Sequence, residues 1–168
     1  MERVLRRVDA FGAALNRGIE CVCAALMAAL VLVVGFEVLQ RYVLKLGHTW
    51  GEECSRYLMI WAALLAVPIG AYRREHVGLE FVQNALPARV ARALRLGLDL
   101  LGVAFFLFLT VYGVGMAAAG ATQYTTLFGM TMVVPFASVP ACGALTSFQI
   151  LVTMLRDRGS LPSARRAA

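Results

Sequence analysis

Two glutamates and two arginines cluster where the first two long apolar segments of this sequence adjoin a polar connector. Glu37 and Arg41 are four residues apart and Glu53 and Arg56 are three apart, so on a helix each acid has a base within reach. An acid at membrane depth can bind a proton or a cation, which makes these residues candidates for an ion site. A coupling acid, however, has to be without a permanent counter-ion. We therefore interpret Glu37, Arg41, Glu53 and Arg56 as a structural charge clasp that fixes two neighbouring helices.

Residue patterns typical of catalysis or metal binding are not evident in the sequence. The two histidines, His48 and His76, fall in different polar segments, and the four cysteines include no Cys-x-x-Cys pair. No nucleophile–base pair or phosphate-binding loop stands out. We therefore expect no enzymatic activity, no bound metal and no cofactor in this chain.

The composition is that of an integral membrane protein. Hydrophobic residues make up 60% of the 168 residues and charged residues 15%, whereas soluble domains have roughly 45–50% and ~25%. Between Leu100 and Leu155 there is no Asp, Glu, Lys or Arg, a stretch that suits two membrane spans of about 20 residues each and a short turn. The net charge of +6 is explained by basic residues that flank spans, so we do not expect nucleic-acid binding.

We predict an all-α integral membrane protein with four transmembrane helices and an N-terminal amphipathic surface helix. Apolar residues recur at helical spacing over about residues 3–17, with arginines off that stripe, as in a helix that lies at the membrane surface. Residues 1–168 are expected to form a single membrane domain. Its four spans are expected at about 19–42, 53–72, 92–119 and 128–153, and a basic tail at 156–168.

The distribution of Lys and Arg predicts the orientation in the membrane. Residues 1–18 carry four of these residues, residues 73–95 carry five and residues 156–168 carry four, whereas the connectors at 39–56 and 119–127 carry three and none. Loops on the cytoplasmic side are enriched in Lys and Arg. We therefore predict a multi-pass membrane protein with both termini and the loop at 73–95 in the cytoplasm.

A series of short motifs resembles a known family. Arg-Tyr at 41–42 is followed by Trp-x-Glu-Glu at 50–53, Ser-Arg-Tyr at 55–57, Trp61, and Arg-Arg-Glu-His at 73–76. In this order and on a chain of this length, the series resembles the small permease subunit of tripartite ATP-independent periplasmic (TRAP) transporters, the DctQ family, over about residues 15–155. The residues that carry this resemblance or are expected as membrane-interface anchors are Tyr42, Trp50, Glu52, Tyr57, Trp61, Arg73, Arg74 and His76.

The resemblance implies a function in organic-acid uptake as part of a heteromeric complex. Such subunits pair with a large permease subunit that carries the sodium and substrate sites of a sodium symporter. A periplasmic substrate-binding protein delivers the substrate. The resemblance thus implies that this chain is a static scaffold in the bacterial inner membrane that contacts the large subunit and membrane lipids. For any contact with the binding protein, Glu52 in the outward-facing connector is the best candidate, because Glu53 is expected in the clasp. No cofactor is expected on this chain, since sodium is expected on the large subunit.

Two other functions fit parts of the pattern. An independent four-span, proton-coupled small carrier would use Glu37 as its coupling acid, but it would need that acid near mid-membrane and without a counter-ion. A membrane anchor for a redox enzyme would need His48 and His76 at one haem, and the predicted topology separates them. Purification discriminates among the three, since a scaffold comes with a large partner, a carrier as a homodimer and an anchor with a coloured cofactor.

Overall fold

Four long helices make up the structure, a computed structural model that describes residues 2–45, 50–73, 86–125, 129 and 131–160. The helices are α1 (Glu2–Leu39), α2 (Trp50–Arg73), α4 (Ala88–Ala119) and α5 (Val133–Ser160). A short π-helix, η1 (Gln40–Leu44), extends α1, and a 3-10 turn, η2 (Gly120–Thr122), follows α4. No β-strand forms in these residues, where Tyr124 and Thr131 make a single antiparallel bridge.

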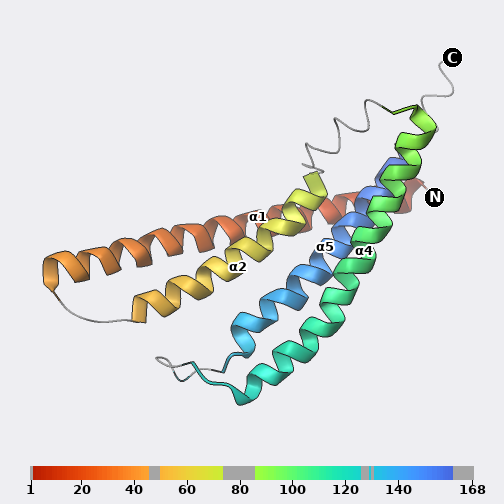
Figure 1. The fold of residues 1–168 in the computed structure, drawn as a ribbon. Helices are drawn as coiled ribbons and strands as arrows, with labels where there is room; N and C mark the ends of the chain where they lie inside the picture. The colour runs from red at the N-terminus through yellow and green to blue at the C-terminus, as the bar shows by residue number, and fades with distance from the viewer. Residues whose placement is uncertain (1, 46–49, 74–85, 126–128, 130, 161–168) are drawn as a thin grey trace.

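The helices form two antiparallel hairpins that pack through their inner members. α1 packs against α2 and α4 against α5, while α2 and α5 contact each other and the beginning of α1 contacts α5. In Figure 1, α1 and α4 are accordingly the outer helices, with α2 and α5 between them. We call the end at which α1 and α4 begin and α2 and α5 end the N-terminal end of the bundle, and the other the opposite end.

The predicted all-α membrane fold is confirmed. Each of the four helices contains a segment long and apolar enough to cross a membrane, by length and composition. Within α1, however, the predicted surface helix at 3–17 and the predicted first span at 19–42 are continuous, because α1 runs unbroken from Glu2 to Leu39. No proline interrupts this helix, and its Gly12, Asn16 and Ile19 lie buried on one face, so a single stripe serves both parts.

The other helix bounds differ from the predicted spans mainly around α5. Pro87 is the residue before the first turn of α4, which begins at Ala88. α5 begins at Val133 rather than at residue 128, and it continues to Ser160, so the first part of the predicted basic tail is helical. Gly129 has a φ of +58°, a left-handed conformation outside the right-handed helical region.

Small residues allow α4 and α5 to pack closely. A Cβ added at Gly143 of α5 would lie 2.5 Å from Thr110 Oγ1 and 2.8 Å from the Phe106 carbonyl oxygen of α4. A Cβ at Gly113 of α4 would lie 3.0 Å from the Pro140 ring of α5. Close approach of helices through small residues is a common basis of packing in membranes, where lipid removes the hydrophobic drive for association.

A row of polar residues occupies the buried face of α5. The row follows helical spacing, and its members are Ser138, Cys142, Thr146, Gln149 and Thr153. Ser138 and Thr153 donate hydrogen bonds to carbonyl oxygens three residues earlier in α5, so these hydroxyls are satisfied within their own helix. Hydroxyl groups that are satisfied in this way can be buried against neighbouring helices without partners from them, whereas the Gln149 amide donates to a carbonyl oxygen of α1.

Candidate functional site

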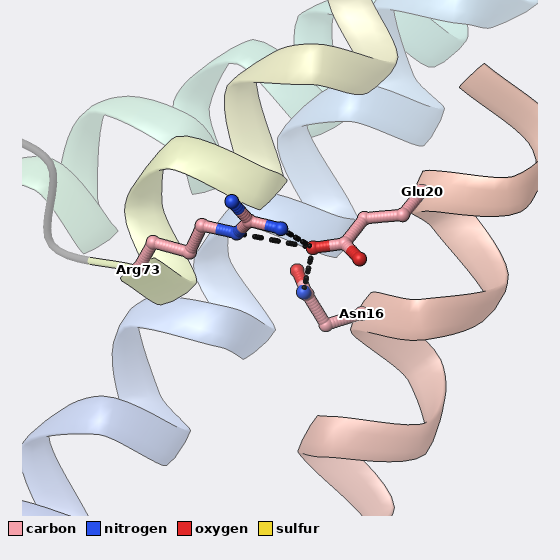
Figure 2. A network of polar contacts seen from close by, with 3 residues as sticks. All are labelled: Asn16, Glu20 and Arg73. Atoms are coloured by element: carbon pink, nitrogen blue, oxygen red, sulfur yellow. Dashed lines mark hydrogen bonds and ion pairs between the residues drawn. The ribbon is translucent and has the colours of Figure 1, made fainter. Parts of the chain in front are cut away.

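The strongest polar contact between two helices lies at the N-terminal end of the α1–α2 hairpin. Arg73, the last residue of α2, donates hydrogen bonds from Nε at 3.1 Å and from Nη2 at 2.6 Å to Glu20 Oε1 of α1. Asn16, one turn before Glu20, donates from Nδ2 to the same oxygen at 2.7 Å. Figure 2 shows the three side chains converging on this single carboxylate oxygen.

The positions of these three residues follow from antiparallel packing. Glu20 lies near the beginning of the apolar part of α1, and Arg73 ends α2, so the two residues reach the same level of the bundle. The arginine side chain is about half exposed and the glutamate is one-third exposed. Water can therefore reach the pair, which moderates its contribution to stability, and the pair sets the register of α1 against α2.

The acidic residues at the beginning of α2 have different partners. Arg56 Nη2 lies 3.9 Å from Glu52 Oε1, one turn away on the same helix, and both side chains are 63% exposed. Glu53 Oε1 accepts a hydrogen bond of 2.6 Å from the Tyr57 hydroxyl, which also lies 3.9 Å from the sulfur of Met132 just before α5. Glu53 and Tyr57 thus join the beginning of α2 to the segment that precedes α5.

Glu37 and Arg41 are not paired in the structure. Glu37 packs over Gly51, where an added Cβ would lie 3.4 Å from the Glu37 Cβ, and Gly51 thereby lets α2 begin close to α1. Arg41 is exposed and belongs to η1, where hydrogen bonds join residues five apart. This wider turn moves Arg41 away from the position four residues after Glu37. In the structure Arg56 lies near Glu52, and Glu37 lies over Gly51. The clasp of four residues therefore stays a prediction.

Among the described residues, no group of three or more His, Cys, Asp or Glu side chains is arranged to hold a metal ion. The polar contacts at both ends of the α1–α2 hairpin join helices or turns of one helix. What this arrangement can do chemically is hold α1 and α2 in register at the N-terminal end through Arg73 and Glu20, and hold the beginning of α2 against the segment before α5 at the opposite end. His48, His76 and Arg74 lie outside the described residues.

Comparison with known proteins identifies the family. The family model for the DctQ component of tripartite ATP-independent periplasmic transporters matches residues 30–159, well over half of the chain. The chain belongs to the DctQ family. The resemblance predicted from the motifs is thereby confirmed, and the family is one of transporter components rather than of enzymes.

Individual relatives of this DctQ-family chain are similar over parts of their length. A relative from Haemophilus influenzae is 33% identical over 73 residues, which are 44% of this chain and 45% of that protein. The sialic acid TRAP transporter small permease protein SiaQ of Vibrio cholerae is 31% identical over 81 residues, 48% of this chain and 47% of SiaQ. The sialic acid TRAP transporter permease protein SiaT of Haemophilus influenzae is 23% identical over 138 residues, 82% of this chain and 22% of SiaT. The matched part of this chain thus spans less than half of each relative.

Two tryptophans of the motif quoted above join α2 to its two neighbouring helices. Trp61 donates from Nε1 to the Val134 carbonyl oxygen of α5 at 3.2 Å. Trp50 lies with its ring centroid 6.0 Å from that of Phe36 on α1. Tyr42, by contrast, is largely exposed on η1. The motif therefore includes residues that position α2 between α1 and α5.

Three polar residues that join helices were not predicted from the sequence, two on α1 and one on α5. Glu20 and Asn16 lie four residues apart on α1, and Gln149 is fully buried on α5. Glu20 could have been found, because antiparallel spans bring the beginning of the first to the end of the second, where Arg73 lies. Gln149 donates to the Gly12 carbonyl oxygen at 3.4 Å, and nothing in the local sequence signals that contact.

Proposed function

We propose that this chain is the small membrane subunit of a sodium-driven, binding-protein-dependent TRAP transporter for organic acids. In this proposal it acts as a static scaffold for a large permease subunit. It lies in the bacterial inner membrane with both termini in the cytoplasm, as the distribution of Lys and Arg indicates.

The observation that carries this proposal is the large apolar surface that the chain leaves uncovered. Of the most apolar 18 residues of each span, 0% are buried in α1 and 6% in α4, compared with 44% in α5. The outer helices therefore offer long apolar faces to lipid and to the helices of another subunit. A large multi-span permease is a partner of matching chemistry, because helices in a membrane associate through close apolar packing.

A scaffold role is supported by the location of the charged groups. Residues 21–36, 57–72 and 100–119 contain no Asp, Glu, Lys or Arg, so the cores of three helices have no ionisable acid or base for coupling. The charged contacts of α1 and α2 lie outside these uncharged segments, at Glu20, Glu52, Arg56 and Arg73. A sodium- or proton-coupled carrier needs a charge at depth or broken helices whose carbonyl oxygens bind the ion.

The nature of the partner and substrate is supported by the relatives. In SiaT the region similar to this chain is 22% of a longer TRAP permease protein, so in that relative most of the permease lies beyond the matched region. The names of SiaT and SiaQ include sialic acid, an organic acid. We extend the class of substrate, an organic acid, to the complex that contains this chain.

Reconstitution tests the proposal. Proteoliposomes with an inward sodium gradient should take up the substrate of the cognate binding protein when they contain this chain, the large subunit and the binding protein. This chain alone should show no uptake. Uptake by this chain alone that is abolished by Glu37→Gln would contradict the scaffold role and favour the small proton-coupled carrier.

A further inference from the structure

We propose that a bound water molecule joins α1 to α5 at the N-terminal end of the bundle by donating to Asn16 and to Gln149. Both residues are buried, Gln149 with 0% and Asn16 with 6% of its surface exposed. Asn16 Oδ1 and Gln149 Oε1 are both shielded from solvent, and no protein group in the described part of the chain donates a hydrogen bond to either oxygen. Buried polar atoms are almost always hydrogen-bonded, so a donor belongs here.

The orientation of both side-chain amides is assigned from their other contacts. Asn16 Nδ2 donates to the Glu20 carboxylate at 2.7 Å, and Gln149 Nε2 donates towards the Gly12 carbonyl oxygen at 3.4 Å. Exchange of oxygen and nitrogen in either amide would place an acceptor against an acceptor. The two unsatisfied atoms are therefore both acceptors, and they cannot satisfy each other.

The two oxygens belong to the same contact between helices. Gln149 meets α1 at Gly12, and Asn16 follows Gly12 by four residues on the same face of α1. Val152 of α5 closes the contact on the other side of Gly12, where an added Cβ would lie 2.7 Å from its Cγ1. We therefore place the water between the Asn16 and Gln149 side chains, next to the contact of Gly12 with Val152.

Water fits this pair of acceptors better than a cation does. One water molecule has two hydrogens to donate, and buried waters typically bridge polar groups that protein donors leave unsatisfied. A sodium ion would need several more oxygen ligands. The carboxylate oxygen of Glu20 that faces Asn16 already accepts from Arg73, and Asp9, which also has an unsatisfied oxygen, is seven residues from Asn16, about 10 Å along the helix.

The bridge would complete a polar network across three helices. Arg73 of α2 bonds to Glu20 of α1, Asn16 bonds to the same carboxylate oxygen, and the water would continue the network to Gln149 of α5. The network holds the beginning of α1 at a fixed position against both inner helices. Gly12 and Asn16 belong to the part of α1 that was predicted as a surface helix, residues 3–17.

The first test measures thermal unfolding of the whole chain in lipid nanodiscs. Gln149→Met keeps the size of the side chain, and we expect it to lower the unfolding midpoint by about 2–4 °C, because Asn16 and the water lose a partner. Asn16→Leu in addition should lower the midpoint by less than the sum of the two single effects. A rise of the midpoint in Gln149→Met, as expected for removal of an unsatisfied oxygen, or full additivity in the double variant, would overturn the proposal.

A matched control uses another buried polar residue on the same face of α5. Ser138 is 11 residues from Gln149, about 16 Å along the helix, and its hydroxyl already donates to the Pro135 carbonyl oxygen. The effects of Ser138→Ala and Asn16→Leu on the unfolding midpoint should be additive.

A cation at this position is tested separately. Replacement of sodium by potassium at constant ionic strength should leave the unfolding midpoint of the unaltered chain unchanged. Stabilisation by sodium that is lost in the Asn16→Leu, Gln149→Met variant would show a cation site and overturn the water bridge.

A second measurement uses only the unaltered protein, so it does not depend on whether any variant folds. Solid-state NMR with transfer of magnetisation from water protons should give a strong signal for the assigned Gln149 side-chain amide, although that side chain is inaccessible to solvent. The backbone amide of Cys142, which lies in the buried part of α5, provides the internal reference, with weak transfer expected. Absence of transfer to Gln149 above that reference would overturn the proposal even if every variant failed to fold.

Discussion

Arg73 and Glu20 are 53 residues apart in the sequence, and Nη2 of the arginine lies 2.6 Å from Oε1 of the glutamate. The pair joins the end of α2 to the beginning of the apolar part of α1. At the other end of the same hairpin, Gly51 lets α2 begin against Glu37. One charged contact and one close packing contact thus fix the register of α1 against α2 over the length of the hairpin.

The Arg73–Glu20 pair should be more important for folding than the pair at the beginning of α2. Arg73→Ala should lower both the unfolding midpoint and the yield of folded chain, because it removes two donors from a carboxylate that joins two helices. Arg56→Ala is the matched control, since Arg56 pairs with Glu52 one turn away and both side chains are mostly exposed. The exchange Glu20→Arg, Arg73→Glu should recover part of the loss. Equal effects of Arg73→Ala and Arg56→Ala on the midpoint would contradict this role.

Close packing of α4 and α5 predicts a strong effect at one glycine and a weak effect at another. Gly143→Ala should destabilise the chain by about 1–3 kcal/mol, because the added methyl group meets Thr110 and the Phe106 carbonyl oxygen and pushes the helices apart. Gly115→Ala should change stability by no more than about 1 kcal/mol and in the stabilising direction, since no atom lies within 4 Å of the added Cβ. Reversible unfolding in mixed detergent micelles measures both. A Gly143→Ala variant as stable as Gly115→Ala would show that the two helices are not packed as described.

The spans could be predicted from the sequence because length and hydropathy decide whether a segment can cross a membrane. The residues at which helices begin and end could not be predicted where the local backbone conformation decides them. The left-handed Gly129 and the bridge between Tyr124 and Thr131 precede α5, although the apolar pattern alone favours an earlier start. The π-helix η1 likewise gives no hydropathy signal, and it changes the expected spacing between Glu37 and Arg41.

The polar site was predicted only in part for a related reason. Spacing within one helix can be read from the sequence, so the acids and bases near the beginning of α2 were identified as a cluster. The choice of Glu52 over Glu53 as the partner of Arg56 depends on side-chain geometry. The contact between Gln149 and Gly12 depends on how α5 packs against α1, which spacing within either helix does not determine.

The charge of Glu53 and its hydrogen bond can be separated by two substitutions. Tyr57→Phe removes the hydroxyl that donates to Glu53, with an expected cost of about 1 kcal/mol, the usual net value of one hydrogen bond. Glu53→Gln keeps an acceptor for Tyr57 and removes the charge. If the predicted clasp acts through charge, Glu53→Gln should lower the amount of complex with the large subunit more than Tyr57→Phe does, as measured by co-purification. Normal assembly of Glu53→Gln with loss of sodium coupling would instead indicate a coupling site.

The predicted orientation in the membrane can be tested at one position before α5 and one at its end. Gln123 is exposed after η2, and Ser160 is the last residue of α5. In a background without the native cysteines, a membrane-impermeant maleimide should label Gln123→Cys in intact spheroplasts and Ser160→Cys only after the membrane is opened. Labelling of Ser160→Cys in intact spheroplasts would show that the chain has the opposite orientation.

Glu52 is the acid at the beginning of α2 that is best placed to meet a periplasmic partner. Its side chain is 63% exposed and its ion pair with Arg56 is long, at 3.9 Å, so the carboxylate is accessible on the side predicted to face the periplasm. A contact between exposed charges mainly affects the rate of association and weakens with salt. Glu52→Lys should therefore slow uptake by the complete transporter at low salt and have less effect at high salt, while assembly with the large subunit stays normal. Arg56→Glu is the matched control, because it also breaks the ion pair but adds negative charge. Uptake by Glu52→Lys that equals the unaltered transporter at low salt would exclude Glu52 from the docking surface.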